Sequence, residues 1–258
     1  SQRKRQALMV LCGLVTTAYL LYRGLYTLNY EGWYGVLASW MLYGAEIWGG
    51  VSLLLFFLQV WDTTEPAEER PLEGVTVDVL VPTYNEDVSL LRGTLQACLA
   101  MDYPHRLYLL DDGSRDEVRQ LCEELGVHYI TRDEHLHAKA GNLNHALEKT
   151  DGEFVAILDA DHIPEPHFLS KMTGPVRDRR LGCVQSPHAF SNFDTFQGRV
   201  NYEKGRFWDE GELFYKIIQP GRNSSDSVVF AGSAALFRRE ALRDVGYIAS
   251  ETITEDMH

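Results

Sequence analysis

Two long apolar runs open the chain. Residues 8–28 and 34–61 are apolar and aromatic throughout, and Arg23 and Glu46 are their only charged side chains. A helix of roughly 20 apolar residues spans the hydrocarbon core of a bilayer, so each run predicts a transmembrane helix. The alternative is a pair of buried helices in a soluble bundle, but both runs leave little polar face for water. We therefore expect residues 1–61 to hold two transmembrane helices.

The charges around these runs predict their orientation. The cluster Arg3-Lys4-Arg5 precedes the first run, which favours a cytoplasmic N-terminus, and two spans return the chain to that side. Arg23 and Glu46 are costly in lipid, so each is expected to face a helix bundle, a membrane interface or the other. Residues 62–74, acidic and containing Pro66, read as a linker.

From Val75 onward, short β-rich runs alternate with amphipathic stretches, which is typical of a layered α/β sheet. The predicted strands are 77–81, 107–110, 127–131, 154–158 and 181–185, and the predicted helices are 89–100, 117–125, 140–148 and 167–172. Polar residues follow four of these strands. Because ligands bind at the carboxyl ends of strands in open α/β sheets, these four polar clusters are expected to converge on one cleft.

Composition restricts the partners of this cleft. Of the 258 residues, 24 are Lys or Arg and 37 are Asp or Glu, giving a formal charge of -13, which argues against nucleic acid as a partner. A bound phosphate must then be held locally or through a metal. The four cysteines show no C-x-x-C spacing, which fits a reducing, cytoplasmic setting.

The strongest candidate for metal chemistry follows the strand at 154–158. Asp159 and Asp161 flank a small residue, so their carboxylates can share one cation such as Mg²⁺ or Mn²⁺ bridging a diphosphate. His162 is either a further ligand or a partner of one. Taken alone, a D-x-D sequence is also compatible with a solvated or capping pair.

Two other segments suit a nucleotide. Asp111 and Asp112, before Gly113, can accept from a uracil imide or a ribose hydroxyl, although an Asp-rich turn that caps the next helix has the same sequence. Lys139 lies just before a predicted helix, where a cation and backbone N–H groups can face a diphosphate. Walker and G-x-G-x-x-G motifs are absent from the sequence, which weakens kinase and dehydrogenase interpretations.

A last acidic cluster, Thr254-Glu255-Asp256, lies near the end of the chain. It could cap a helix. It could also supply a general base, because an acceptor hydroxyl that attacks an anomeric carbon must lose its proton.

Seven motifs, in order from about Val77 to the last residue, together resemble the processive family 2 glycosyltransferases, in particular the catalytic subunits of bacterial cellulose synthases. They are Pro82-Thr83-Tyr84-Asn85-Glu86, Asp111-Asp112-Gly113, His137-Ala138-Lys139-Ala140-Gly141-Asn142, Asp159-Ala160-Asp161-His162, Gln185-Ser186-Pro187-His188, Phe230-Ala231-Gly232-Ser233 and Thr254-Glu255-Asp256.

The resemblance implies a GT-A (Rossmann-like) fold over residues 75–258 and an inverting transfer from UDP-glucose to a growing β-1,4-glucan. It further implies a multi-pass protein of the bacterial inner membrane, its catalytic domain cytoplasmic, with a periplasmic or export partner subunit. The residues between Phe190 and Tyr215 resemble an amphipathic helix along the membrane, with a core-facing helix as the competing interpretation. By the same resemblance, the uridine is surrounded by Thr83, Tyr84, Glu86, Asp111 and Asp112, and the diphosphate contacts Lys139. The metal is held by Asp159, Asp161 and His162, and Asp256 is the base. The acceptor side is shaped by His188 and the segment that contains Phe230, Gly232 and Ser233, and Gln185 is a further substrate-binding residue.

The sequence departs from this family after its T-E-D motif. A Q-x-x-R-W motif, further membrane helices and a domain for a cyclic dinucleotide activator are not present, so we expect a C-terminally truncated fragment that binds nucleotide better than it polymerises. The alternatives are a synthase of β-1,3-glucan, hyaluronan or chitin, a non-catalytic nucleotide-sugar-binding membrane scaffold, and a phosphohydrolase using Asp159. The phosphohydrolase is disfavoured because that class usually has a Thr or Val soon after a D-x-D-G sequence, whereas His162-Ile163-Pro164 follows the D-x-D sequence here.

Overall fold

The computed structural model describes residues 2–64, 68–189 and 210–250. The chain divides into two compact units. The helical unit comprises Ser1–Glu65 and Ala189–Val228, and the sheet unit comprises Pro66–His188 and Val229–His258. Residues 189–228 thus group with the N-terminal helices, although they lie within the range 75–258 predicted for the sheet domain.

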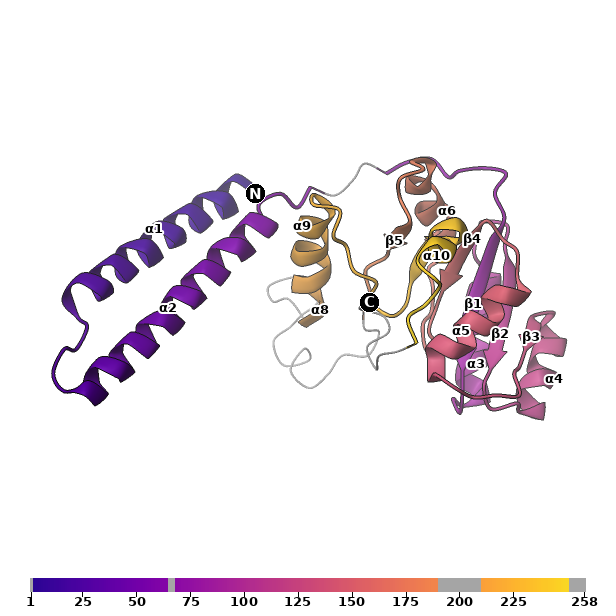
Figure 1. The fold of residues 1–258 in the computed structure, drawn as a ribbon. Coiled ribbons are helices and arrows are strands. Elements are labelled where there is room, and N and C mark those ends of the chain that lie inside the picture. Colours follow the sequence, from indigo (N-terminus) through magenta and orange to yellow (C-terminus); the bar gives the residue numbers. More distant parts are fainter. Residues whose placement is uncertain (1, 65–67, 190–209, 251–258) are drawn as a thin grey trace, which may run out of the picture. The chain divides into compact units, whose positions relative to one another are not determined.

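Two antiparallel helices form most of the helical unit: α1 (Gln2–Tyr26) and α2 (Trp33–Gln59) (Figure 1). Small residues let them approach closely, since a Cβ on Gly50 would lie 2.8 Å from the Leu20 side chain. Both helices are long and apolar enough to cross a membrane, and most of their large apolar side chains are exposed. Arg23 and Glu46 face each other, with Nε and Oε2 3.2 Å apart, which is one of the three arrangements expected from sequence.

A second helical segment of this unit runs through α8 (Glu210–Leu213), the π-helical turn η3 (Phe214–Ile218) and α9 (Gln219–Asn223). It packs closely on the end of α2, because a Cβ on Gly221 would lie 2.6 Å from the carbonyl oxygen of Gln59. The amphipathic helix predicted between Phe190 and Tyr215 falls largely outside the described residues.

A six-stranded mixed sheet, in the order β3-β2-β1-β4-β6-β5, forms the sheet unit. Strands β1 (Val77–Thr83), β2 (Arg106–Asp111), β3 (His128–Ile130) and β4 (Phe154–Ile157) pair in parallel. Strand β6 (Ala235–Arg238) is antiparallel to both of its neighbours, β4 and β5 (Cys183–Gln185). The carboxyl ends of β1 to β5 therefore lie along one edge.

Helices cover both faces of this sheet because β1 is apolar on both sides. Val77, Val79 and Val81 pack with α3 (Val88–Leu99), α4 (Asp116–Leu125) and α6 (Phe168–Thr173). Leu80 packs on the opposite face with α5 (Ala138–Lys149) and α10 (Arg239–Asp244). This alternation follows from the two-residue period of a strand. Strand β6 and α10 were not predicted from the sequence.

A buried ion network joins the other edge of the sheet. Asp78, fully buried at the start of β1, accepts from Arg239 Nη2 (2.8 Å), Arg106 Nε (2.8 Å) and the amide of Gly152 (2.7 Å). Arg239 also donates to the carbonyl oxygens of Leu147 and Gly152. Burial of a charged pair is tolerated when every polar atom finds a partner, so this network fixes α10 and β6 to the parallel strands.

Candidate active site at the carboxyl edge of the sheet

A cavity of about 620 Å³ opens where β1, β2 and β4 end. It draws on three of the four polar clusters predicted to converge, those that follow β1, β2 and β4, together with the start of α5. Its lining residues are Pro82, Thr83, Tyr84, Glu86, Leu90, Asp112, His135, Ala138, Lys139, Asn142, Asp159, Ala160 and Asp161.

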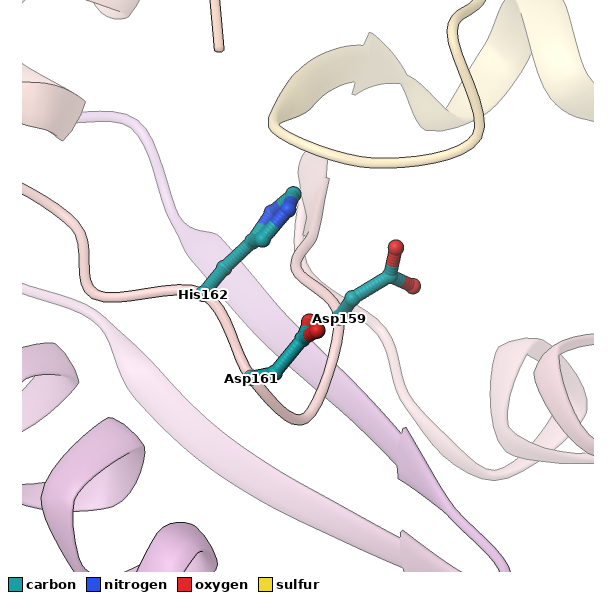
Figure 2. A group of neighbouring side chains, drawn as sticks. All are labelled: Asp159, Asp161 and His162. Carbon is teal, nitrogen blue, oxygen red and sulfur yellow. The ribbon is translucent and has the colours of Figure 1, made fainter. Parts of the chain in front are cut away.

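Asp159, Asp161 and His162 form the candidate metal cluster. They occupy the turn after β4, closed by a hydrogen bond from the amide of His162 to the carbonyl oxygen of Asp159 (3.1 Å). All three side chains project to the same side of this turn (Figure 2), and one ligand atom from each lies within 4.8 Å of the others. Carboxylate oxygens with one imidazole nitrogen suit Mg²⁺ or Mn²⁺, so the donor set fits a divalent cation.

Lys139 faces the same cluster from the first turn of α5. Its Nζ lies 2.5 Å from Asp159 Oδ1 and donates to the carbonyl oxygen of Gly232 (2.6 Å). The turn before the helix is unusual, because His137 (φ 62°) and Ala138 (φ 41°) both have left-handed backbone conformations. Lys139 was predicted just before a helix and lies in the first turn of α5, with its ammonium on Asp159; its role at a diphosphate stays a prediction.

The segment after β1 forms another wall. Glu86 Oε2 accepts from Thr83 Oγ1 (2.5 Å) and from the amide of Tyr84 (2.8 Å). Burial acts to raise the pKa of Glu86, but these hydrogen bonds outweigh it and hold the pKa below its ordinary value. Glu86 is therefore a carboxylate at neutral pH, and the ring of Tyr84 stays exposed.

Asp111 and Asp112 have different surroundings although they are adjacent. Asp111 is fully buried and accepts from the amide of Arg115 (2.6 Å) and from the Tyr129 hydroxyl (3.0 Å). It lies beneath the start of α4 and does not line the cavity, which matches the capping alternative. Asp112 points the other way and does line the cavity, because successive side chains at a strand end alternate.

Sequence reasoning missed two residues that hold Asp112. Arg132 donates to both carboxylate oxygens of Asp112, from Nε (2.5 Å) and from Nη2 (2.8 Å), and His135 Nδ1 lies 3.1 Å from Oδ1. The Arg132 hydrogen bonds, opposed by burial and helped by His135, hold the pKa of Asp112 below its ordinary value. In sequence both residues lie in a polar loop and carry no motif. The only local signal is their position after a strand.

Gln185 and His188 gather around Ser233 rather than lining the cavity. Gln185 Nε2 and His188 Nε2 each lie 2.9 Å from the Ser233 carbonyl oxygen. The Ser233 hydroxyl accepts from the amide of Asp159 (2.7 Å) and lies 2.7 Å from His162 Nδ1. Ser233 thus connects the segment after β5 to the candidate metal cluster.

Three predicted site residues remain: Phe230, Gly232 and Asp256. Phe230 packs edge-on against Phe237, 5.0 Å between ring centroids, next to the core that α5 and α10 cover. Gly232 contributes the carbonyl oxygen that Lys139 contacts. Asp256 lies outside the described residues, so its role as base stays a prediction.

The sheet is mixed and flanked by helices on both faces, and the acidic cluster and Lys139 lie at the carboxyl edge of its parallel strands, where open α/β folds bind their ligands. Residues 78–246 match the family model described as Glycosyl transferase family 2, and the chain belongs to that family. The resemblance seen in the sequence is therefore confirmed.

Comparisons with individual proteins agree. The chain is 41% identical to a UDP-forming cellulose synthase catalytic subunit of Pseudomonas fluorescens (strain SBW25), over 98% of this chain and 35% of that protein. It is 40% identical to cellulose synthase 1 of Komagataeibacter xylinus, over 100% of this chain and 17% of that protein. The chain spans about a third or less of the length of these relatives.

Solved structures show the same fold. The mannosyltransferase PcManGT from Pyrobaculum calidifontis, in complex with GDP-Man and Mn²⁺, superposes with a TM-score of 0.59 at 23% identity, over 83% of this chain and 59% of that one. S. aureus TarS 1-349 gives 0.52 at 18% identity, over 70% and 53%. The expected GT-A fold is confirmed.

Proposed function

We propose that this chain is the donor-binding part of a membrane-bound inverting glycosyltransferase that transfers glucose from UDP-glucose to a growing β-1,4-glucan. The observation that carries the proposal is the cavity that brings Asp159, Asp161 and Lys139 together at the carboxyl edge of a family 2 sheet. Identity of about 40% to cellulose synthases supports the sugar and the product. Cytoplasmic placement of the sheet unit follows from the predicted orientation of α1 and α2.

The strand order supports a placement of the two ends of UDP at two ends of the cavity. Strands lie about 4.8 Å apart, so the end of β2 lies roughly 10 Å from the end of β4 across β1. We place the diphosphate at β4, against Lys139, and the uridine toward β2, against Thr83, Tyr84, Glu86 and Asp112. Asp111 contributes by supporting this wall from beneath.

Asp159, Asp161 and His162 would hold the cation, Mg²⁺ or Mn²⁺, which neutralises charge on the leaving diphosphate when bound. Lys139 adds a second positive charge from the helix side. Asp256 would take the proton of the acceptor hydroxyl, while Gln185, His188 and the segment from Phe230 to Ser233 would form the acceptor side through their contacts around Ser233.

Calorimetric titration of the detergent-purified chain with UDP, with and without Mn²⁺, tests the donor site. Metal-dependent binding that Asp161→Ala abolishes is the expected result. Asp151→Ala is the matched control, because Asp151 lies before β4 at the opposite edge of the sheet, where it pairs with Arg106. Absence of UDP binding by folded wild-type chain would favour a non-catalytic scaffold.

Product analysis tests the sugar and the linkage. A longer chain that also carries the part of these relatives outside the matched region should convert UDP-glucose to β-1,4-glucan. In that protein, Asp256→Asn should abolish transfer and spare UDP binding. A β-1,3-glucan from UDP-glucose would overturn the linkage. Chitin from UDP-N-acetylglucosamine, or hyaluronan when UDP-glucuronate is also supplied, would overturn the sugar; each of these products would leave the proposed nucleotide site in place.

A further inference from the structure

One arginine side chain closes the loop between β3 and α5. Arg132 is 8% exposed, and beyond its two bonds to Asp112 it donates from Nη1 to the carbonyl oxygen of Leu136 (2.6 Å) and from Nη2 to that of Ala138 (3.0 Å). A planar guanidinium offers its donors in a rigid fork, so these four bonds fix three chain segments relative to one another.

The same loop packs against α5 with no room for a side chain. A Cβ on Gly141, in the first turn of the helix, would overlap the carbonyl oxygen of Leu136 and approach Arg132 Nη1 to 2.5 Å. His137 and Ala138, between these contacts, hold left-handed conformations that are unfavourable for residues with a Cβ. Such conformations persist only where the surroundings determine them.

Lys139 follows directly on this constrained turn. Its Nζ reaches Asp159 and the carbonyl oxygen of Gly232. The position of the ammonium in the cavity therefore depends on the path of residues 132–138, and that path depends on Arg132.

From these contacts we infer that Arg132 is a positioning residue: by tying Asp112 to the Leu136 and Ala138 carbonyls, it sets the turn that aims Lys139 at the diphosphate of a bound nucleotide. Arg132 acts through the loop and touches no part of the ligand. The inference rests on the proposed nucleotide site and adds to it the element that orders its phosphate-binding end.

The test compares UDP with uridine by calorimetry on the full detergent-purified chain in Mn²⁺, using Arg132→Gln. We expect UDP affinity to fall about 10-fold and uridine affinity to fall no more than about threefold, because the phosphate end relies on Lys139 while the uridine end loses only the support that Arg132 gives Asp112. Arg132→Lys should behave like Arg132→Gln, since an ammonium keeps the charge but lacks the fork. Gly141→Ala, which displaces the same loop from the helix side, should reproduce the selective loss.

Two further variants separate positioning from general damage. Arg92→Gln is the matched control, because Arg92 also makes a two-pronged pair, with Glu124, but on the outer surface of α3 and α4, and it should leave both affinities unchanged. Adding Lys139→Ala to Arg132→Gln should cost little more than Arg132→Gln alone, since coupled residues give non-additive losses.

Several outcomes would overturn the inference. They are unchanged UDP affinity in Arg132→Gln, equal losses for UDP and uridine, and losses that multiply with Lys139→Ala. Failure of the wild-type chain to bind UDP would overturn the proposed function along with it, whereas wild-type binding with an unaffected Arg132→Gln variant would overturn this inference alone.

Discussion

Lys139 Nζ and Asp159 Oδ1 lie 2.5 Å apart at the carboxyl edge of the sheet. The same carboxylate belongs to the cluster whose donor atoms suit a divalent cation. An ammonium and a metal ion on one carboxylate oppose each other electrostatically, while both favour a diphosphate. Lys139 therefore has opposite effects on the two ligands.

Lys139→Ala should raise Mn²⁺ affinity without nucleotide and lower UDP affinity in Mn²⁺. The first effect follows because Asp159 loses a competing cation, and the second because the diphosphate loses a counter-charge; each should be on the order of 10-fold. Electron paramagnetic resonance of free Mn²⁺ measures the first and calorimetry the second. Lys149→Ala, at the exposed end of the same helix, is the control. Unchanged Mn²⁺ affinity would show that Lys139 and the metal do not share Asp159.

Much of this edge was predictable because its chemistry is local. The D-x-D carboxylates follow a buried strand, and Lys139 lies where the pattern of a helix begins, so both were singled out from sequence. Which of Asp111 and Asp112 faces the cavity was not, because it depends on the side of β2 that packs on α4. Arg132 was missed for a similar reason, since its fork joins segments 20 residues apart that meet only through β2–β3 pairing.

The sheet shows the same limit. Strands β1 and β4 were predicted from short β-rich runs that polar clusters follow, and both are buried. Strand β6 was not predicted, and its partners β4 and β5 lie far away in sequence. An antiparallel strand inserted between them is a tertiary property.

The ion pair of Asp112 and Arg132 should contribute to the free energy of unfolding at neutral pH, and this contribution should be lost at low pH. Hydrogen bonds from Arg132 and then His135 hold the pKa of Asp112 below 3.8, against the opposing effect of burial. A lowered folded-state pKa means that the contribution is complete above the ordinary value and is lost as pH falls through the lowered one. Asp112→Asn should destabilise the sheet unit by about 3 kcal/mol at pH 7, because Arg132 stays buried without its counter-charge.

Acid titration of both proteins by circular dichroism checks this. The difference between wild type and Asp112→Asn should stay constant from pH 7 to about pH 4 and shrink below that. A difference that is independent of pH down to complete unfolding would contradict the assignment.

The buried ion network of Asp78, Arg106 and Arg239, at the opposite edge of the sheet, should affect the free energy of unfolding and not the affinity for UDP. Arg239→Met leaves Asp78 buried with Arg106 as its remaining charged partner among the described residues, which should cost about 3 kcal/mol. Hydrogen exchange of the β1 and β4 amides measures the loss. Arg243→Met, on the exposed side of the same helix, should change exchange little. UDP affinity of the folded variant should be unchanged, and a selective loss of UDP binding would contradict a structural role.

Three of the four cysteines should resist alkylation. Burial raises the pKa of Cys98, Cys122 and Cys183 to about 12, so the thiolate is scarce at pH 8. Mass spectrometry after iodoacetamide treatment should find these three unmodified in the native chain and all four cysteines modified after denaturation. Rapid native labelling of Cys183, which is partly exposed, would show that its strand opens.

Removal of one charge of the Arg23–Glu46 ion pair should destabilise the helical unit more than removal of both charges. Arg23 and Glu46 contact each other across α1 and α2, and Tyr19 also donates to Glu46 (3.2 Å). Arg23→Leu leaves Glu46 without its counter-ion in an apolar setting, which should destabilise the helix pair by on the order of 1 kcal/mol. Adding Glu46→Leu should restore stability, because two apolar side chains need no partner. Detergent-induced unfolding, followed by tryptophan fluorescence to which α2 contributes Trp33, Trp40 and Trp48, measures both variants against Arg3→Leu. A double variant less stable than the single one would show that the charges themselves hold the helices together.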